Sequence, residues 1–174
     1  MEAKKSTRKA KKFDKQIELL NILENDARRS VKDLAEMLAE NETDIAAQLT
    51  EMEKQKVICG YHTLINWEKT ASERVTALIQ VNVTPERGKG FDKIAERIYR
   101  FDEVRSVYLM SGGYDFTVIV EGATMKEVAM FVAKRLAPLE SVRGTATHLI
   151  LKRYKDYGTV LEPDEKGGRM AVTL

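Results

Sequence analysis

The chain has 174 residues, of which 43% are hydrophobic and 32% charged, with a net charge of +2; this suits one or two small globular domains and excludes global disorder. A single cysteine, Cys59, excludes an intrachain disulfide framework, and the basic start is not followed by the apolar stretch of a signal peptide. Because no run approaches the ~18 apolar residues of a membrane span, we expect a cytoplasmic protein that does not bind membranes.

The small net charge hides an uneven distribution. Residues 1–12 contain six Lys or Arg and one Glu, whereas residues 13–70 contain 7 basic and 12 acidic residues. This basic arm at 1–12 therefore concentrates the charge that could bind phosphates at the start of the chain. From charge alone, a disordered solubilising tail is an equally good interpretation.

Residues 13–65 have the pattern of a small helical domain. Apolar positions at one-turn spacing predict three helices, over residues 14–24, 31–39 and 42–55. Ser30 and Asn41 are suitable N-caps for the second and third helices. A short ribbon is expected at 57–58 and 61–65, and a linker at 66–73. Three short helices with tight connections predict a helix-turn-helix head.

Residues 74–157 change to a period of two. An alternating run over 75–84, stopped by Pro85, predicts a half-buried strand. The elements expected after it are a helix, two strands, a helix and a strand, over residues 91–101, 104–110, 116–120, 125–136 and 142–154. This β-α-β-β-α-β order predicts a ferredoxin-like α+β domain. Its helices cover one sheet face, so the other face needs a partner and a dimer is expected. The polar residues 158–174 are expected to form a flexible C-terminal extension.

Four segments carry a resemblance to a known family. They are FDKQIELLNILENDARRSVKDLAEML, VICGYHTLINWEK, VRSVYLMSGGYDFTVIVEG and VRGTATHLILKRYK. Taken in order, over about residues 13–157, the chain resembles the Lrp/AsnC (feast/famine) transcription regulators. The resemblance implies a winged-helix-like head that binds double-stranded DNA, and dimers formed through the C-terminal sheets. It also implies assembly of dimers up to octamers and a small effector, commonly an amino acid, bound between dimers.

The third helix of the head is the candidate recognition helix. Side chains that reach DNA in such a helix are commonly Arg, Lys, Asn or Gln. The candidates here are Thr43 and Gln48 for bases, with phosphate contacts from residues that precede the helix: Lys9, Lys11, Lys12, Arg28 and Arg29. The outward positions also include Glu42, Asp44 and Glu51, which make this surface acidic. The family usually has Arg at Gln48, often a basic residue at Glu51, Leu-Ser at Glu40-Asn41 and Gly at Lys56.

Carboxylates are repelled by phosphates, which leaves three interpretations open. The helix reads bases while the basic residues hold the backbone; or it binds weakly and depends on the avidity of an oligomer; or the head no longer binds DNA. In the last case the protein would be a ligand-sensing assembly module.

The turn between the two central strands is the candidate effector site. It consists of Ser111, Gly112, Gly113, Tyr114 and Asp115. Exposed N–H groups at such a turn suit a ligand carboxylate, and Asp115 suits a ligand ammonium, which together match an α-amino acid. Thr145 and Thr147 are two apart on one strand and share a face; in the family the equivalent threonines border the effector pocket. An ordinary hairpin explains the same residues without a ligand.

Nothing in the chain predicts an enzyme, a metal site or a cofactor. His62 and His148 are far apart, and Cys59 with His62 supplies only two ligands. Sirohaem decarboxylases share the two-part architecture but carry His and Asn in the middle of the second domain. The matching stretch here, SVYLMSGGYDFTVI, has neither.

Overall fold

The computed structural model describes residues 2–85 and 90–161, with side chains from Asp14 onward. The chain divides into two compact units, Met1–Thr63 and Leu64–Leu174. No helix among the described residues has both the length and the apolar character needed to cross a membrane.

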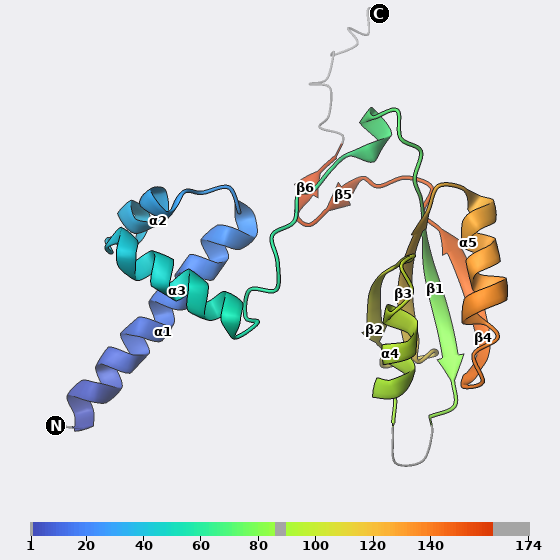
Figure 1. Ribbon diagram of the computed structural model, residues 1–174, viewed down its shortest axis with the longest axis horizontal. Helices are drawn as coiled ribbons and strands as arrows, with labels where there is room; N and C mark the ends of the chain where they lie inside the picture. The colour runs from blue at the N-terminus through green and yellow to red at the C-terminus, as the bar shows by residue number, and fades with distance from the viewer. Residues whose placement is uncertain (1, 86–89, 162–174) are drawn as a thin grey trace, which may run out of the picture. The chain divides into compact units, whose positions relative to one another are not determined.

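The first unit is a bundle of three helices: α1 (Glu2–Asn25), α2 (Val31–Leu38) and α3 (Glu42–Lys54) (Figure 1). The prediction of a helix-turn-helix head is confirmed. The predicted start of the first helix at residue 14 is wrong, because helical backbone begins at Glu2. Residues 2–12 contain mostly Ala, Lys and Arg, without Gly or Pro, and these residues favour the helix.

The core of the head is small. Its buried residues are Leu19, Leu34, Ala35, Leu38, Ile45 and Met52. Leu19 is completely buried, whereas Ile17, whose one-turn spacing from Leu20 and Leu23 predicts a place on the same apolar face, is 42% exposed. The helix is therefore rotated from the orientation that its apolar spacing predicted.

Local capping fixes where α2 begins and ends. The Ser30 hydroxyl accepts a hydrogen bond from Asp33 N, and the Asp33 carboxylate accepts one from Ser30 N, which completes a capping box. The hydrogen bond with the Ser30 side chain, and after it the one with the Ser30 backbone, holds the pKa of Asp33 below its ordinary value of 3.8. Ala39 ends the helix in the left-handed conformation, with φ of 49°.

The segment after α3 does not form the expected ribbon. Residues 57–58 and 61–65 are not in a strand. A strand needs a neighbour to satisfy its backbone groups, and within the described chain no strand pairs with this segment.

The second unit contains a four-stranded antiparallel sheet in the order β2-β3-β1-β4 (Figure 1). In chain order its elements are η1 (Trp67–Lys69), β1 (Val75–Val83), α4 (Asp92–Tyr99), β2 (Val104–Leu109), β3 (Phe116–Gly122), α5 (Met125–Phe131), the π-helical turn η2 (Val132–Leu136) and β4 (Val142–Leu149). The predicted ferredoxin-like order is confirmed.

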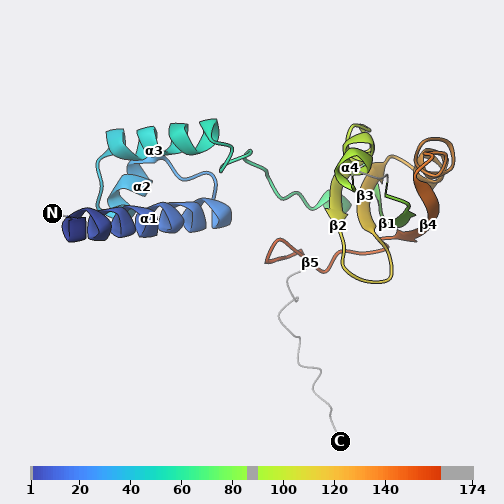
Figure 2. The same ribbon diagram turned by 90° about the horizontal axis from the view of Figure 1, so that it is seen from below.

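Both α4 and α5 lie on the same side of this sheet (Figure 2). The core beneath them is built from alternate residues of the two central strands and from the inner faces of the helices. It consists of Ala77, Ile79, Val81, Val83, Ile94, Ile98, Phe116, Val118, Val120, Val128, Phe131 and Leu136. Within the described part of this unit no helix covers the opposite sheet face, although Leu78 and Ile119 on that face are half-buried.

The last strand is shorter than predicted. β4 ends at Leu149, opposite Ala77 near the start of β1, because beyond that point the sheet offers almost no further backbone to pair with. A ribbon of two short strands, β5 (Lys155–Asp156) and β6 (Thr159–Val160), follows. The expected extension thus begins with a hairpin, and its part beyond Leu161 lies outside the described residues.

Candidate DNA interface and effector site

The turn between β2 and β3 exposes its backbone. Ser111, Gly112 and Gly113 are exposed, and in the described structure the N–H groups of residues 111–114 make no hydrogen bond. Gly112 has a φ of +151° and an added Cβ would meet nothing within 4 Å at Gly112 or Gly113. The turn therefore presents several free donors in open space, as an anionic group requires.

Asp115 has a structural role in addition to the ligand-binding role expected from the sequence. Its Oδ2 accepts a hydrogen bond of 2.8 Å from Val83 N, and its own N–H donates to Val81 O. The carboxylate thus fastens the turn to the end of β1, and one of its oxygens is already occupied. A ligand ammonium would have to share this group with the protein.

Arg143 is a candidate site residue that sequence reasoning missed. Its Nη2 lies 4.0 Å from Asp115 Oδ2, and its side chain is 65% exposed. The β1–β4 register shifts between Asn82 and Val83, beside this arginine, and such bulges redirect side chains. The available signal was an arginine at the start of the last predicted strand, but only the sheet order brings it to the turn.

The two threonines lie on one face of β4. Thr145 pairs with Val81 and Thr147 with Ile79. Thr145 is half-buried beside the residue whose carbonyl receives the Asp115 N–H, whereas Thr147 is exposed and about 7 Å further along the strand. The structure therefore places the turn on one side of the end of β1 and Arg143 and Thr145 on the other, with Thr147 further along β4.

The predicted DNA contacts of the head are distributed unevenly. Arg28 and Arg29 are exposed in the turn before α2, and Arg29 Nε pairs with Asp26 at 2.9 Å. Thr43 is exposed, but Gln48 is half-buried on the side of α3 that carries the core residues Ile45 and Met52. Gln48 was expected to point outward, and the phase of the helix places it closer to the core. The side chains of Lys9, Lys11 and Lys12 lie outside the described residues.

The outward stripe of α3 lies opposite Ile45 and Met52. It consists of Thr43, Ala47, Thr50 and Lys54, all of which are exposed. The Thr50 hydroxyl donates to Ala46 O at 2.9 Å, so its methyl group remains for external contact. This stripe carries no carboxylate.

Acidic residues flank the stripe, and several are tied to neighbours. Asp44 accepts a hydrogen bond from Asn41, Glu51 from Gln55, and Glu53 from the Tyr61 hydroxyl at 2.8 Å. Burial, and then the Glu53 carboxylate, raise the pKa of Tyr61 above its ordinary 10.0. The negative charge that the composition assigns to the whole helix is thus borne by its sides.

Known proteins share this sequence and architecture. The family model of the Lrp/AsnC ligand binding domain matches residues 76–160. An uncharacterized HTH-type transcriptional regulator of Bacillus subtilis, YugG, is 45% identical over 92% of this chain and 97% of its own length. The chain belongs to the Lrp/AsnC family. The resemblance drawn from the four sequence segments is confirmed.

More distant members of the Lrp/AsnC family agree. The leucine-responsive regulatory protein of Haemophilus influenzae is 29% identical over 80% of this chain and 83% of its own. The crystal structure of a Neisseria meningitidis transcriptional regulator in complex with L-Met matches with a TM-score of 0.65 and 20% identity, over 82% of this chain and 91% of that one. At this identity the structural match shows the fold. All of the predicted effector residues lie within the stretch that the ligand-binding model matches.

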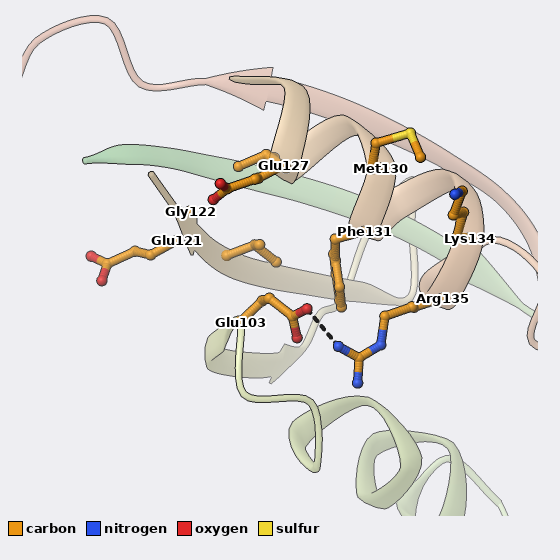
Figure 3. A pocket seen from close by; sticks show the side chains of 10 residues that line it. Glu103, Glu121, Gly122, Glu127, Met130, Phe131, Lys134 and Arg135 are labelled. Atoms are coloured by element: carbon orange, nitrogen blue, oxygen red, sulfur yellow. Dashed lines mark hydrogen bonds and ion pairs between the residues drawn. The ribbon is translucent and has the colours of Figure 1, made fainter. Parts of the chain in front are cut away.

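A separate pocket lies at the opposite end of β3 from the turn. It has a volume of about 460 Å³ and lies between α5 and the start of β2 (Figure 3). Glu103 and Arg135 point toward one another there and form an ion pair, and the Arg135 guanidinium lies 4.5 Å from the centre of the Phe101 ring. None of the predicted effector residues lines it. The described residues contain no group of three or more His, Cys, Asp or Glu that could hold a metal.

Proposed function

We propose that the protein is a sequence-specific DNA-binding transcriptional regulator controlled by a small effector, and that the effector is an amino acid bound between dimers. The observation that carries the proposal is the pairing of two features in one chain of the Lrp/AsnC family. One is a helix-turn-helix head with an exposed stripe free of carboxylates. The other is a ligand-binding domain with exposed N–H donors beside Arg143.

For DNA, α3 enters the major groove with its outward stripe. The methyl groups of Thr43, Ala47 and Thr50 suit the C5-methyl of thymine, and Lys54 reaches a phosphate. Arg28, Arg29 and the basic residues Lys9, Lys11 and Lys12 hold the backbone and make binding depend on salt. Gln48 reaches the groove only from the side, because it is half-buried next to the core.

For the effector, the contacts to its carboxylate are better supported than the contacts to its ammonium group. The free N–H groups of residues 111–114 and the Arg143 guanidinium both suit a carboxylate. The second oxygen of Asp115 and the hydroxyls of Thr145 and Thr147 bind the ammonium. The L-Met held by the Neisseria relative supports an amino acid as the class of ligand.

The uncovered sheet face supports a homodimer, and through it the octamer that the family resemblance implies. Tyr108 on this face is 51% exposed, and the Thr117 hydroxyl is buried without a hydrogen-bond partner. A second sheet packed against this face would bury the Tyr108 side chain and could give the Thr117 hydroxyl a hydrogen-bond partner.

The test is DNA binding by the full-length protein to the region upstream of its own gene, at two salt concentrations, with and without amino acids. We expect a preferred sequence that Ala47→Glu abolishes, because a carboxylate then faces the bases. Asn21→Glu adds the same charge on an exposed face of α1 and should lower affinity only slightly.

A different result would contradict sequence-specific DNA binding. Binding without sequence preference that vanishes at the higher salt would mean that only the basic residues touch DNA. The protein would then be a ligand-sensing assembly module.

A further inference from the structure

Three arginines surround one carboxylate at the end of β3. Glu121 Oε2 lies 3.0 Å from Arg105 Nε and 3.7 Å from Arg74 Nη1, and Oε1 lies 3.6 Å from Arg153 Nη2. The Glu121 side chain is only 19% exposed and points away from the neighbouring pocket (Figure 3). Partial burial makes such a cluster stronger than an exposed ion pair.

The three arginines come from three different segments. Arg74 precedes β1, and its guanidinium lies 3.6 Å from the centre of the Trp67 ring. Arg105 lies where the β2–β3 register shifts, and this bulge turns it toward Glu121. Arg153 follows β4 and donates to the Thr76 hydroxyl. Glu121 therefore holds the linker, the sheet and the C-terminal segment at one point.

A second contact closes the same arrangement. The side-chain amide of Asn66 donates to Leu161 O, directly after β6, at 3.1 Å. The linker residues 66–74 are thus fixed to the sheet unit at both ends, at Asn66 through the ribbon and at Arg74 through Glu121. We call this set of contacts the linker clamp: Asn66, Trp67, Arg74, Glu121, Arg153 and Leu161.

We propose that Glu121 is a positioning residue for DNA binding, which acts by keeping the tether between head and sheet short. On the head side, Ile58 packs against the helical core, and the Tyr61 hydroxyl donates a hydrogen bond to Glu53 of α3. With the linker clamp closed, only residues 62–65 remain as tether. With it open, the tether extends over residues 62–74, as far as β1. This inference rests on the proposed function, because it concerns two heads of a dimer that bind one DNA.

The expected size of the effect on DNA binding follows from the length of the tether. A flexible chain of about 4 residues has a root-mean-square span of about 11 Å, and one of about 13 residues about 20 Å. Effective concentration falls roughly as the −3/2 power of tether length, so opening the linker clamp lowers it about sixfold. A longer tether also reaches half-sites at a wider range of spacings.

The experiment compares Glu121→Gln and Arg74→Gln with the matched control Arg97→Gln, an exposed arginine of α4 outside the linker clamp. The DNA probes are duplexes with one half-site, or two at varied spacing, selected by the wild-type protein from random sequence. We expect both variants to bind the two-site duplexes about sixfold more weakly and with less dependence on spacing, while one-site binding and dimerisation stay unchanged. Equal losses on both probes, or no loss on either, would overturn the positioning role.

Hydrogen exchange tests the linker clamp without DNA. The amides of residues 66–74 should exchange faster in both variants than in the wild-type protein or Arg97→Gln. If they exchange equally fast in all four proteins, the clamp does not exist in solution, and the proposal fails even where DNA binding is found. If instead the wild-type protein shows no sequence preference for DNA, the proposed function fails, and the positioning role fails with it.

Discussion

The two units of this protein are stabilised in different ways. Among the described residues, the head has six in its buried core and depends on caps and turns that lie close together in the sequence. The described part of the sheet unit has twelve, contributed by helices and by strands that pair across long stretches of chain. The head is therefore the unit in which a single change has the larger consequence, and local changes should affect the two units separately.

Leu19→Ala is the change expected to produce the largest difference in stability between the two units. Leu19 is completely buried, and truncation of a buried leucine costs about 2–5 kcal/mol. A small core cannot absorb such a loss, so the head should unfold at lower urea concentration while the sheet unit stays folded. Circular dichroism follows mainly the head, which contains the longest helix, α1, with α2 and α3, and the fluorescence of Trp67, the single tryptophan, follows the sheet unit. If both signals shift together, the units unfold as one and the comparison is wrong.

Asp115→Ala is the corresponding change in the sheet unit. It leaves Val83 N–H without its acceptor at the end of β1, and an unsatisfied group of this kind costs about 1–3 kcal/mol. Trp67 fluorescence in urea should report a lower midpoint, and the helices of the head should be unaffected. Asp102→Ala, on an exposed aspartate after α4, serves as the control and should change little. Equal effects of the two variants would show that the contact to Val83 is unimportant.

Ser30→Ala tests the smallest of the three effects, the capping box of α2. Loss of an N-cap serine costs about 1 kcal/mol and should appear only in the circular dichroism transition, whereas Ser30→Thr should retain most of the stability. Because the pKa of Asp33 is lowered from 3.8, its stabilising contribution is complete above that value and is lost as the pH falls through the lower pKa of the folded state. Acid titration of the wild-type protein should therefore show a larger loss of head stability below about pH 4 than titration of Asp33→Asn. An identical acid transition in the two proteins would show that the capping box contributes nothing.

Much of the fold could be read from local patterns. The alternation along β1 predicted which residues face the core, and Ala77, Ile79 and Val81 are completely buried. Ser30 marked the start of α2 because its capping partner, Asp33, is only three residues away. The failures came where the deciding neighbour is distant. Ile17 fits an apolar helix face as well as Leu19 does. Only the packing of α2 and α3 against α1 determines that Leu19 is the residue buried in the core.

The sequence by itself determined the family, the order of the elements and the turn that could bind an effector, because these depend on residues close together in the chain. Tertiary structure alone decided that Asp115 is fastened to Val83, that Arg143 stands beside it, and that Gln48 lies near the core. It alone gathered three arginines around Glu121 and joined Asn66 to Leu161, 95 residues away. Strand order and register set such contacts, and both are properties of the folded sheet rather than of any one segment.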